Sequence, residues 1–260
     1  MKSSIQFLLA ACIFFSLTGC ERDPYDEPEH TVSINFTVGS MLKSTATPAE
    51  NAVDEILLFT LDSDNKVVKH PIIQLSGAEL TISKKVKWFY AIANPTTTLK
   101  NQNPASVTDL EDLTWDFQTA LTPTSKFPMS GKQEYSGTKS ISIELVRLVA
   151  KINITTSDTK FTDISLAVTT PRYGYIFART PLSVPNASTR VTYNFSNFNS
   201  PVYVAENVGT SNLTRFVVNG KYEGNAINPA LDFNLREGTQ GINIVRNTCY
   251  EVPISFQYAN

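Results

Sequence analysis

The sequence SISIELVRLVAKINIT at residues 140–155 contains two alternating apolar patterns that do not share a phase. Ile141, Ile143 and Leu145 occupy odd positions. Even positions are then occupied by Val146, Leu148, Ala150, Ile152 and Ile154. Successive side chains of a strand point to opposite faces, so a one-residue change of phase moves the buried face to the other side. We interpret the change as a strand that leaves one domain for another, at 145/146. A β-bulge inside a single sandwich is the alternative.

The same period-two alternation continues on both sides of this stretch. Residues 31–38 read TVSINFTV and place Val32, Ile34, Phe36 and Val38 on one face. Residues 55–61 and 87–93 are more continuously apolar, which is typical of central strands that are covered on both sides. Further strands are predicted at 161–168, 173–177, 231–235 and 250–258. Pro253, in the last of these, indicates a strand at a sheet edge.

Turn residues separate the strands, and one segment has helical spacing. Turns are predicted at 62–65 and 94–95, and Asn219-Gly220 predicts a hairpin turn. Residues 104–121 carry Leu110, Leu113 and Phe117 at helical spacing, with Ser106 or Thr108 as the cap. The pattern predicts an all-β protein made of two tandem β-sandwich domains, residues 31–145 and 146–260, with a short helical segment in the first.

The amino-terminal residues 1–19 have the features of an export signal. Lys2 precedes a short apolar run at 5–17, and the string Leu17-Thr18-Gly19-Cys20 follows it. This ending predicts a lipoprotein signal, with cleavage between Gly19 and Cys20 and acylation of Cys20. The alternatives are an ordinary signal peptide or a short membrane helix, although a spanning helix needs roughly 20 residues. Several acyl chains on one cysteine would anchor the chain stably in a membrane.

An acidic segment follows the lipidation site. Residues 21–29 read ERDPYDEPE, a composition that cannot form a core. We therefore interpret residues 20–30 as a solvated tether between the lipid and the first domain.

The sequence contains no recognisable equipment for catalysis. Neither His30 nor His70 has a cysteine, aspartate or glutamate at the sequence spacing of a metal site. The sequence also contains neither a Gly-x-Ser-x-Gly nucleophile elbow nor a phosphate-binding glycine loop. The neighbouring Glu111 and Asp112 could act as acid and base, but a solvated helix face is the simpler explanation. We expect no enzyme, no cofactor and no metal site.

Charge and cysteine content narrow the functional classes further. The net charge is −2, and no basic cluster with interleaved aromatic residues occurs, so we expect no binding of nucleic acid. Once the signal is removed and Cys20 is acylated, Cys249 alone remains, so no disulfide within the chain is available. We expect Cys249 to be a packed small residue rather than a reactive thiol.

Several motifs resemble the fimbrillin-like family, the subunits of type V pili in Gram-negative anaerobes. They are, in order, YAIANP at 90–95, MSG at 129–131 with IELVRLVAKI at 143–152, YVAEN at 203–207 and RNTCYEV at 246–252. The resemblance implies two β-sandwich domains of transthyretin-like topology and export as a lipoprotein. It also implies assembly outside the outer membrane, where the acidic tether resembles a signal for surface display rather than for a periplasm-facing location.

The resemblance implies a mechanism based on strand exchange. In that family a protease removes the lipidated end together with the first strand, and an extended strand of another subunit fills the vacated groove. The matching candidate strand here carries Val32, Ile34, Phe36 and Val38, a pattern that also suits an ordinary half-buried strand. No arginine occurs between Arg22 and Arg147, so Lys43 is the nearest site for processing by a protease.

Two departures from the family pattern argue against an ordinary stalk subunit. The missing arginine favours an uncut anchor subunit that keeps its lipid. The short sequence after Tyr258, only Ala259 and Asn260, favours a tip subunit that accepts a strand without donating one. The charged members of the motifs, Arg147 and Glu206, would form either a buried ion pair or two separate rim residues.

The leading functional hypothesis is therefore a structural and adhesive subunit of a cell-surface pilus. Its partners would be other pilus subunits, through strand addition, and the outer membrane, through the lipid. The alternative is a stand-alone surface lipoprotein that binds a glycan or a host protein through sandwich loops. Exposed aromatic residues such as Trp115, Tyr173 or Tyr193 would serve that role.

Lipidation can be tested directly in a Gram-negative host by labelling with a fatty acid and separating the membranes. Replacing Cys20→Ala should abolish both the label and membrane retention, because no other acceptor thiol lies at the cleavage site. Cys12→Ala is the matched control and should change neither, because Cys12 leaves with the signal. Labelling that persists in Cys20→Ala would contradict the lipoprotein interpretation.

Overall fold

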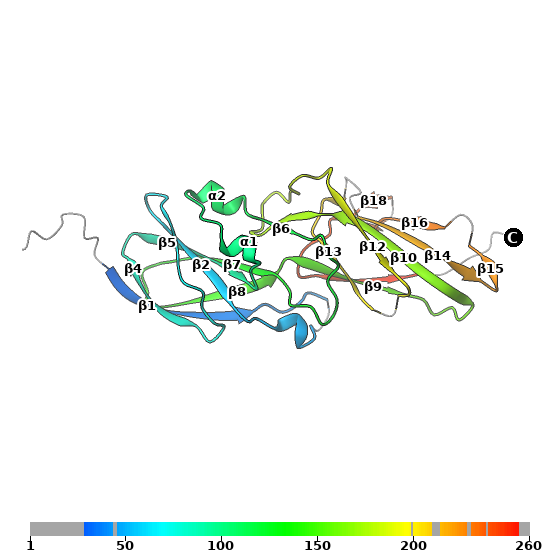
Figure 1. Ribbon diagram of the computed structural model, residues 1–260, viewed down its shortest axis with the longest axis horizontal. Coiled ribbons are helices and arrows are strands. Elements are labelled where there is room, and N and C mark those ends of the chain that lie inside the picture. Colours follow the sequence, from blue (N-terminus) through cyan, green and yellow to red (C-terminus); the bar gives the residue numbers. More distant parts are fainter. Residues whose placement is uncertain are drawn as a thin grey trace, which may run out of the picture.

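The computed structural model describes residues 29–43, 46–198, 200–209, 214–227, 230–237 and 239–254. Gly19, Cys20 and the tether up to residue 28 lie outside the described residues, so the predictions made for them are carried by sequence alone. Figure 1 shows an elongated molecule built almost entirely of strands, with two short helices on one side. The prediction of an all-β fold is confirmed.

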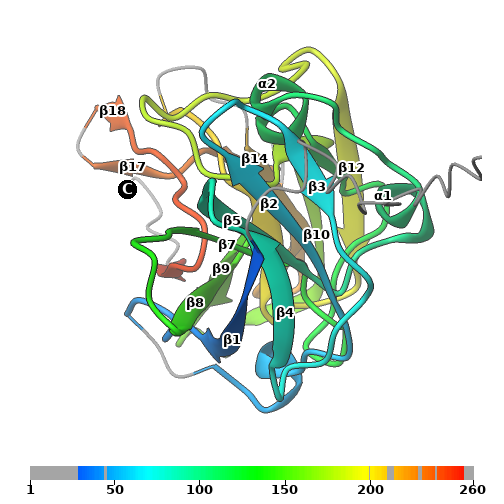
Figure 2. The same ribbon diagram turned by 90° about the vertical axis from the view of Figure 1, so that its left-hand side faces the viewer.

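The first sheet has seven strands in the order β3-β2-β5-β7-β8-β1-β4. Its strands are β1 (Glu29–Val38), β2 (Ile56–Asp62), β3 (Val67–Lys69), β4 (Ala78–Ser83), β5 (Val86–Ala93), β7 (Met129–Glu134) and β8 (Ser140–Arg147). Nearly all residues of β2 and most of β5 are buried, as their continuous apolar sequences predict. In the view along the long axis, β1 lies between β4 and β8 (Figure 2).

The remaining strands form two further sheets and two short ribbons. The three-stranded sheet has the order β13-β9-β19 and is made of β9 (Val149–Thr155), β13 (Val202–Ala205) and β19 (Cys249–Pro253). The five-stranded sheet is made of β10 (Phe161–Pro171), β12 (Arg190–Phe195), β14 (Arg215–Tyr222), β15 (Asn225–Ala226) and β16 (Leu231–Phe233). The ribbons are β6 (Thr114–Asp116) with β11 (Tyr173–Tyr175), and β17 (Arg236–Glu237) with β18 (Gln240–Gly241).

Buried side chains gather in two separate hydrophobic clusters. The first lies on the seven-stranded sheet and includes Ile34, Phe59 and Phe89. The second lies between the three-stranded and five-stranded sheets and includes Ile152 and Phe216. The first cluster also takes in Leu148 and Val149, which follow the expected boundary at 145/146. The division into two domains there stays a prediction.

The phase change in residues 140–155 coincides with a change of sheet. Strand β8 pairs with β1 and β7, whereas β9, which begins two residues after β8 ends, pairs with β13 and β19. The inward side chains change from Leu145, fully buried at the end of β8, to Leu148 and Ala150. Residues 140–155 therefore form two strands of different sheets, and the choice between a domain boundary and a single sandwich stays a prediction.

Strand β19 lies at an edge of its sheet, which fits its proline. Pro253 is the last residue of β19 and lies opposite Thr155 in a parallel pairing with β9. A proline cannot donate a ladder hydrogen bond and is tolerated at such an edge.

The predicted helix at 104–121 is mostly wrong. The structure has two short helices nearby, α1 (Thr97–Lys100) and α2 (Val107–Glu111), and Ser106 caps α2 with a reciprocal hydrogen bond from Asp109. Strand β6 begins at Thr114, and its neighbour Phe117 is buried while Asp116 is exposed. A helix end followed by a strand reproduces the spacing of Leu110, Leu113 and Phe117, so periodicity alone did not separate the two.

The predicted hairpin turn at Asn219-Gly220 is also wrong. Both residues lie inside β14, and the turn to β15 falls at Glu223-Gly224, with φ angles of 51° and 82°. Two consecutive positive φ angles match the turn type that joins tight hairpins. Gly220 has a different role, because a Cβ there would lie 3.0 Å from the carbonyl oxygen of Thr162, where the β10–β14 pairing is irregular.

These turn assignments predict different costs for two substitutions. Gly224→Ala should lower the free energy of unfolding by about 1 kcal/mol, because an L-residue is disfavoured at this φ while its Cβ meets no other atom. Asn219→Ala, on the exposed side of β14, should cost much less. Denaturant unfolding measures both. A larger loss for Asn219→Ala would contradict this hairpin.

Candidate functional site

Strand β1 occupies a groove between two other strands. Residues 29–34 pair antiparallel with β4, and residues 33–38 pair parallel with β8. The side chains of Val32 and Ile34 are fully buried, Phe36 is nearly so, and Val38 is half-buried. The predicted inward face of this strand is confirmed. That the strand is exchanged stays a prediction.

The amino-terminal end of β1 is stabilised by polar contacts. The Nε2 atom of His30 lies 2.7 Å from the hydroxyl of Tyr135, and the amide of Ser33 donates to the carbonyl of Lys139 at 2.9 Å. His30 therefore belongs to the strand, not to the tether as the sequence suggested.

The chain after β1 continues towards the second cluster. The amide of Gly39 donates to the carbonyl of Leu145 at 2.9 Å. Leu42 then forms a parallel bridge with Thr248: its amide donates to the carbonyl of Asn247, and its carbonyl accepts from the amide of Cys249. Residues 39–42 therefore link the first sheet to the start of β19, and Lys43 follows them directly.

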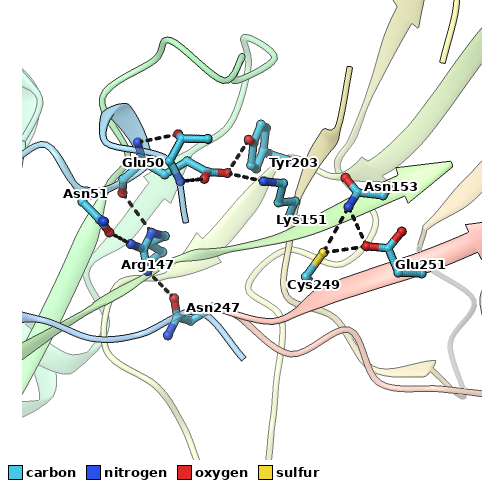
Figure 3. Close-up of polar contacts among 10 residues, drawn as sticks. Glu50, Asn51, Arg147, Lys151, Asn153, Tyr203, Asn247, Cys249 and Glu251 are labelled. Carbon is cyan, nitrogen blue, oxygen red and sulfur yellow. Dashed lines mark hydrogen bonds and ion pairs between the residues drawn. The ribbon is translucent and has the colours of Figure 1, made fainter. Parts of the chain in front are cut away.

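Arg147 is fully buried and lies where residues 39–42 pass from the first sheet to the start of β19, a place that we call the crossing. Its Nη1 donates to the carbonyl of Gly39 at 2.9 Å and to Oδ1 of Asn247 at 2.7 Å. Its Nε donates to the carbonyl of Glu50 at 2.9 Å, and its Nη2 donates to Oδ1 of Asn51 (Figure 3). Burial lowers the pKa of Arg147, while the charge of Glu50 opposes this, and the guanidinium stays protonated.

Asn247 completes the contact with the chain after β1. Its backbone has a φ of 56°, a conformation that asparagine tolerates better than most residues. Its Nδ2 donates to the carbonyl of Ser40 at 2.7 Å while its Oδ1 accepts from Arg147. Arg147 and Asn247 thus hold two consecutive main-chain carbonyls, those of Gly39 and Ser40. We call this pair the carbonyl clamp.

Glu50 is a buried carboxylate beside the clamp, on the short 3-10 turn Ala49–Asn51. It accepts hydrogen bonds from the Tyr203 hydroxyl and the Thr47 amide, each at 2.5 Å, and pairs with Lys151 at 3.0 Å. Burial alone would raise the pKa of Glu50, but these three contacts together hold it below its ordinary value. Burial and the bond to Glu50 raise the pKa of Tyr203.

Glu206 pairs with a different arginine from the one considered in the sequence. It forms a buried ion pair with Arg246, whose Nη1 and Nη2 also donate to the carbonyls of Ile176 and Tyr175 at 2.7 and 2.6 Å. Arg147 instead binds carbonyl and amide oxygens. Both the Arg147–Glu206 pair and the alternative of two rim residues are therefore wrong.

Other motif residues connect main-chain segments. The hydroxyl of Ser130 donates to the carbonyl of Ile176 at 2.6 Å, and a Cβ on Gly131 would lie 2.4 Å from the carbonyl oxygen of Glu144. Asn94 donates to the carbonyls of Ala52 and Phe127 at 2.9 and 2.8 Å. Each of these motif residues therefore contacts a main-chain segment that is distant in the sequence or on a neighbouring strand.

The described residues show how the groups considered for catalysis are engaged. They hold no cluster of His, Cys, Asp and Glu side chains that could bind a metal ion. Glu111 pairs with Lys132, and Asp112 pairs with Arg179, so the two carboxylates are engaged in surface ion pairs. Within the same part of the chain, no helix has both the length and the apolar character needed to cross a membrane.

The aromatic residues considered for ligand binding differ in exposure. Tyr193 is buried and its hydroxyl donates to the carbonyl of Phe117. Trp115 and Tyr173 are half-buried and line an open cavity of about 560 Å³ beside α1 and α2, together with Gln102 and Asp112.

The buried carboxylate predicts a pH-dependent stability. Glu50→Gln should destabilise the protein at pH 7 by about 3 kcal/mol, because it breaks a buried ion pair and a charged hydrogen bond. The folded pKa is lower than the unfolded value of about 4.3, so this stabilisation is complete above that pH. It is lost as the pH falls through the lower folded value.

Denaturant unfolding at pH 7 and at pH 3 measures this difference. The gap between the parent and Glu50→Gln should narrow at the lower pH. Glu79→Gln, at an exposed position of β4, is the control and should change stability little at pH 7. An equal gap at both pH values would show that the charge of Glu50 does not contribute.

Comparison with known proteins shows likeness in fold. No protein-family model matches the chain, and no curated protein is similar to it in sequence. Among solved structures, the fold resembles a fimbrial assembly protein from Parabacteroides distasonis (14% identity, 88% of this chain and 92% of that one, TM-score 0.58). It also resembles the C-terminally truncated tip fimbrial protein Mfa3 from Porphyromonas gingivalis (15% identity, 90% and 97% covered, TM-score 0.58).

A third solved structure, a proposed cell adhesion protein from Bacteroides eggerthii, has 14% identity, coverage of 87% and 85%, and a TM-score of 0.54. The chain therefore shares its fold with fimbrial and adhesion proteins from Parabacteroides, Porphyromonas and Bacteroides. This agrees with the resemblance of its motifs to the fimbrillin-like family.

Proposed function

We propose that this chain is a structural and adhesive subunit of a cell-surface pilus that assembles by strand exchange. The observation that carries the proposal is the setting of β1. Strand β1 lies between β4 and β8 with its apolar side chains inward, and Lys43 follows shortly after its end in the sequence. Removing β1 would expose the main-chain groups of both neighbours, and such unpaired groups demand a new partner strand.

The fold and the motifs support the same proposal from independent directions. The solved structures with this fold include a fimbrial assembly protein and a tip fimbrial protein. The partners of this chain would be other pilus subunits, and the subunit would work without catalysis. Acylation at Cys20 would hold the precursor on the surface of the outer membrane before assembly.

Two positions in a pilus agree with the lack of arginine between Arg22 and Arg147. A tip subunit would accept a strand in the β1 groove after processing at another residue, such as Lys43. An anchor subunit would keep both its own β1 and its lipid. We favour the accepting subunit, because β1 and residues 39–43 form one continuous segment that a single cut could release.

A second candidate function rests on the cavity beside α1 and α2. Half-buried aromatic rings next to amide and carboxylate groups, here Trp115 and Tyr173 near Gln102 and Asp112, are a setting in which sugars bind. A stand-alone surface lipoprotein would use this cavity for a glycan. Binding on a glycan array that is lost in Tyr173→Ala, together with no strand exchange, would favour this candidate.

Strand exchange can be tested with the full chain carrying a protease recognition sequence between Lys43 and Ser44. After the cut, an isotopically labelled peptide of residues 29–43, added in excess, should replace the native segment, which native mass spectrometry detects. The same protein left uncut is the matched control and should incorporate no peptide, because its own β1 stays covalently attached.

The outcome separates the two pilus positions. Incorporation supports an accepting subunit, and stable multimers on an unboiled gel would show that the chain also donates a strand. A cut chain that retains its own segment against a large excess of peptide would contradict acceptance at this groove.

A further inference from the structure

We propose that the β1 groove accepts only strands with a break in their apolar alternation, and that the carbonyl clamp of Arg147 and Asn247 fixes the position of this break. The partner is an extended segment of another polypeptide. Its apolar residues match Val32, Ile34, Phe36 and Val38 and then, three residues later, Met41. This inference rests on the proposed strand exchange and specifies which strand can take part.

The break is visible in the burial of β1 and its continuation. Val32, Ile34 and Phe36 point inward at even positions and Val38 is half-buried, but the next inward side chain is Met41, with 5% of its surface exposed. Its neighbours point outward: Ser40 is exposed, and Leu42 is 60% exposed. The inward phase therefore changes between Val38 and Met41.

The neighbouring strand changes phase at the same level. Val38 lies opposite Leu145 in the parallel pairing of β1 and β8. From Leu145 the next deeply buried apolar side chain is Leu148, again three residues later. Both strands thus change their inward phase at the same level, and a strand that takes the place of β1 must change phase there too.

A break of this kind removes an ambiguity of register. A strand held by alternation alone could slip by two residues and still present apolar side chains to the groove. With the break, a two-residue slip of this segment would bring Gly39 or Lys43 to the buried position of Met41. Only one register therefore fills every inward position.

The clamp marks this register through main-chain atoms. Arg147 and Asn247 donate to the carbonyls of Gly39 and Ser40, the two residues at the break, at 2.9 and 2.7 Å. Buried donors without acceptors are costly, so an incoming strand has to place two carbonyls here. The side chain at the Ser40 position is exposed, so its identity is free. The Gly39 position is buried, and a Cβ there would lie 2.6 Å from Oε1 of Glu144, so this position favours glycine.

The amide groups of the segment add one exclusion. The amides of Ser33, Gly39 and Leu42 donate to the carbonyls of Lys139, Leu145 and Asn247, each at 2.9 Å. A proline at any of these positions would remove a donor. The partner segment therefore has four alternating apolar residues, then two residues that are not inward-facing, then a fifth apolar residue. It has no proline at the positions of Ser33, Gly39 and Leu42.

The test uses the full chain cut after Lys43 and three labelled peptides of residues 29–43. One has the native sequence. One carries Ser40→Met with Met41→Ser, which keeps the composition but makes the alternation unbroken. One carries Thr37→Ser with Ser40→Thr, a matched exchange between two exposed positions. The second should bind about tenfold more weakly or worse, since it leaves a buried methionine site empty, and the third should match the native peptide.

The clamp is tested in the protein by Asn247→Asp, which keeps the shape of the side chain but replaces the donor to Ser40 with an oxygen. This variant should take up the native peptide several-fold more weakly. Native-like uptake would overturn the role of the clamp. If Asn247→Asp does not fold, the comparison of the native and the unbroken peptide still tests whether the groove requires the break in alternation.

Failures of the two proposals are distinguishable. Equal uptake of the native and the unbroken peptide would overturn the selective break and leave strand exchange standing. No uptake of the native peptide would overturn strand exchange at this groove, and the selection of a partner strand with it.

Discussion

The buried guanidinium of Arg147 constrains the structure more than any other single group. A cation without solvent must have every donor direction met by oxygen, or the fold loses several kcal/mol. Its acceptors come from Gly39, from the turn at Glu50 and Asn51, and from Asn247. The end of β1, the turn that follows it and the start of β19 must therefore all be in place together.

This constraint connects the fold to the proposed function. Gly39, one acceptor of Arg147, belongs to the segment that strand exchange would remove. Glu50 and Asn51, two further acceptors, follow that segment in the chain. Loss of residues 29–43 would leave Arg147 without the Gly39 carbonyl and Asn247 without the Ser40 carbonyl. An empty groove would thus be unfavourable at its polar end as well as along its apolar face. A replacing strand restores both.

The sequence predicted those parts of the fold that depend on local pattern. Alternation located β1, continuous apolar runs located β2 and β5, and the phase change in residues 140–155 located the passage from β8 to β9. Local pattern failed where two structures share one spacing, as for Leu110, Leu113 and Phe117, or where a glycine has another role, as at Gly220. At Gly220 the close approach of the Thr162 carbonyl favours glycine, and spacing does not report such a contact.

The polar contacts of the site were beyond local pattern for a different reason. Arg147 and Glu206 were identified as the charged residues of the motifs, but their partners lie far away in the sequence. Arg147 reaches Glu50, and Glu206 reaches Arg246. These contacts depend on how segments distant in the sequence pack together, which local pattern does not report. One feature did carry the information: the motifs contain polar residues next to fully apolar runs, and buried polar groups need partners.

The most direct test of this account is a high-resolution structure of an assembled pilus that contains this chain. The account predicts that a segment of a neighbouring subunit lies between β4 and β8, parallel to β8, with two of its carbonyls bound by Arg147 and Asn247. A pilus in which every copy of the chain still holds its own residues 29–43 in that groove would contradict it.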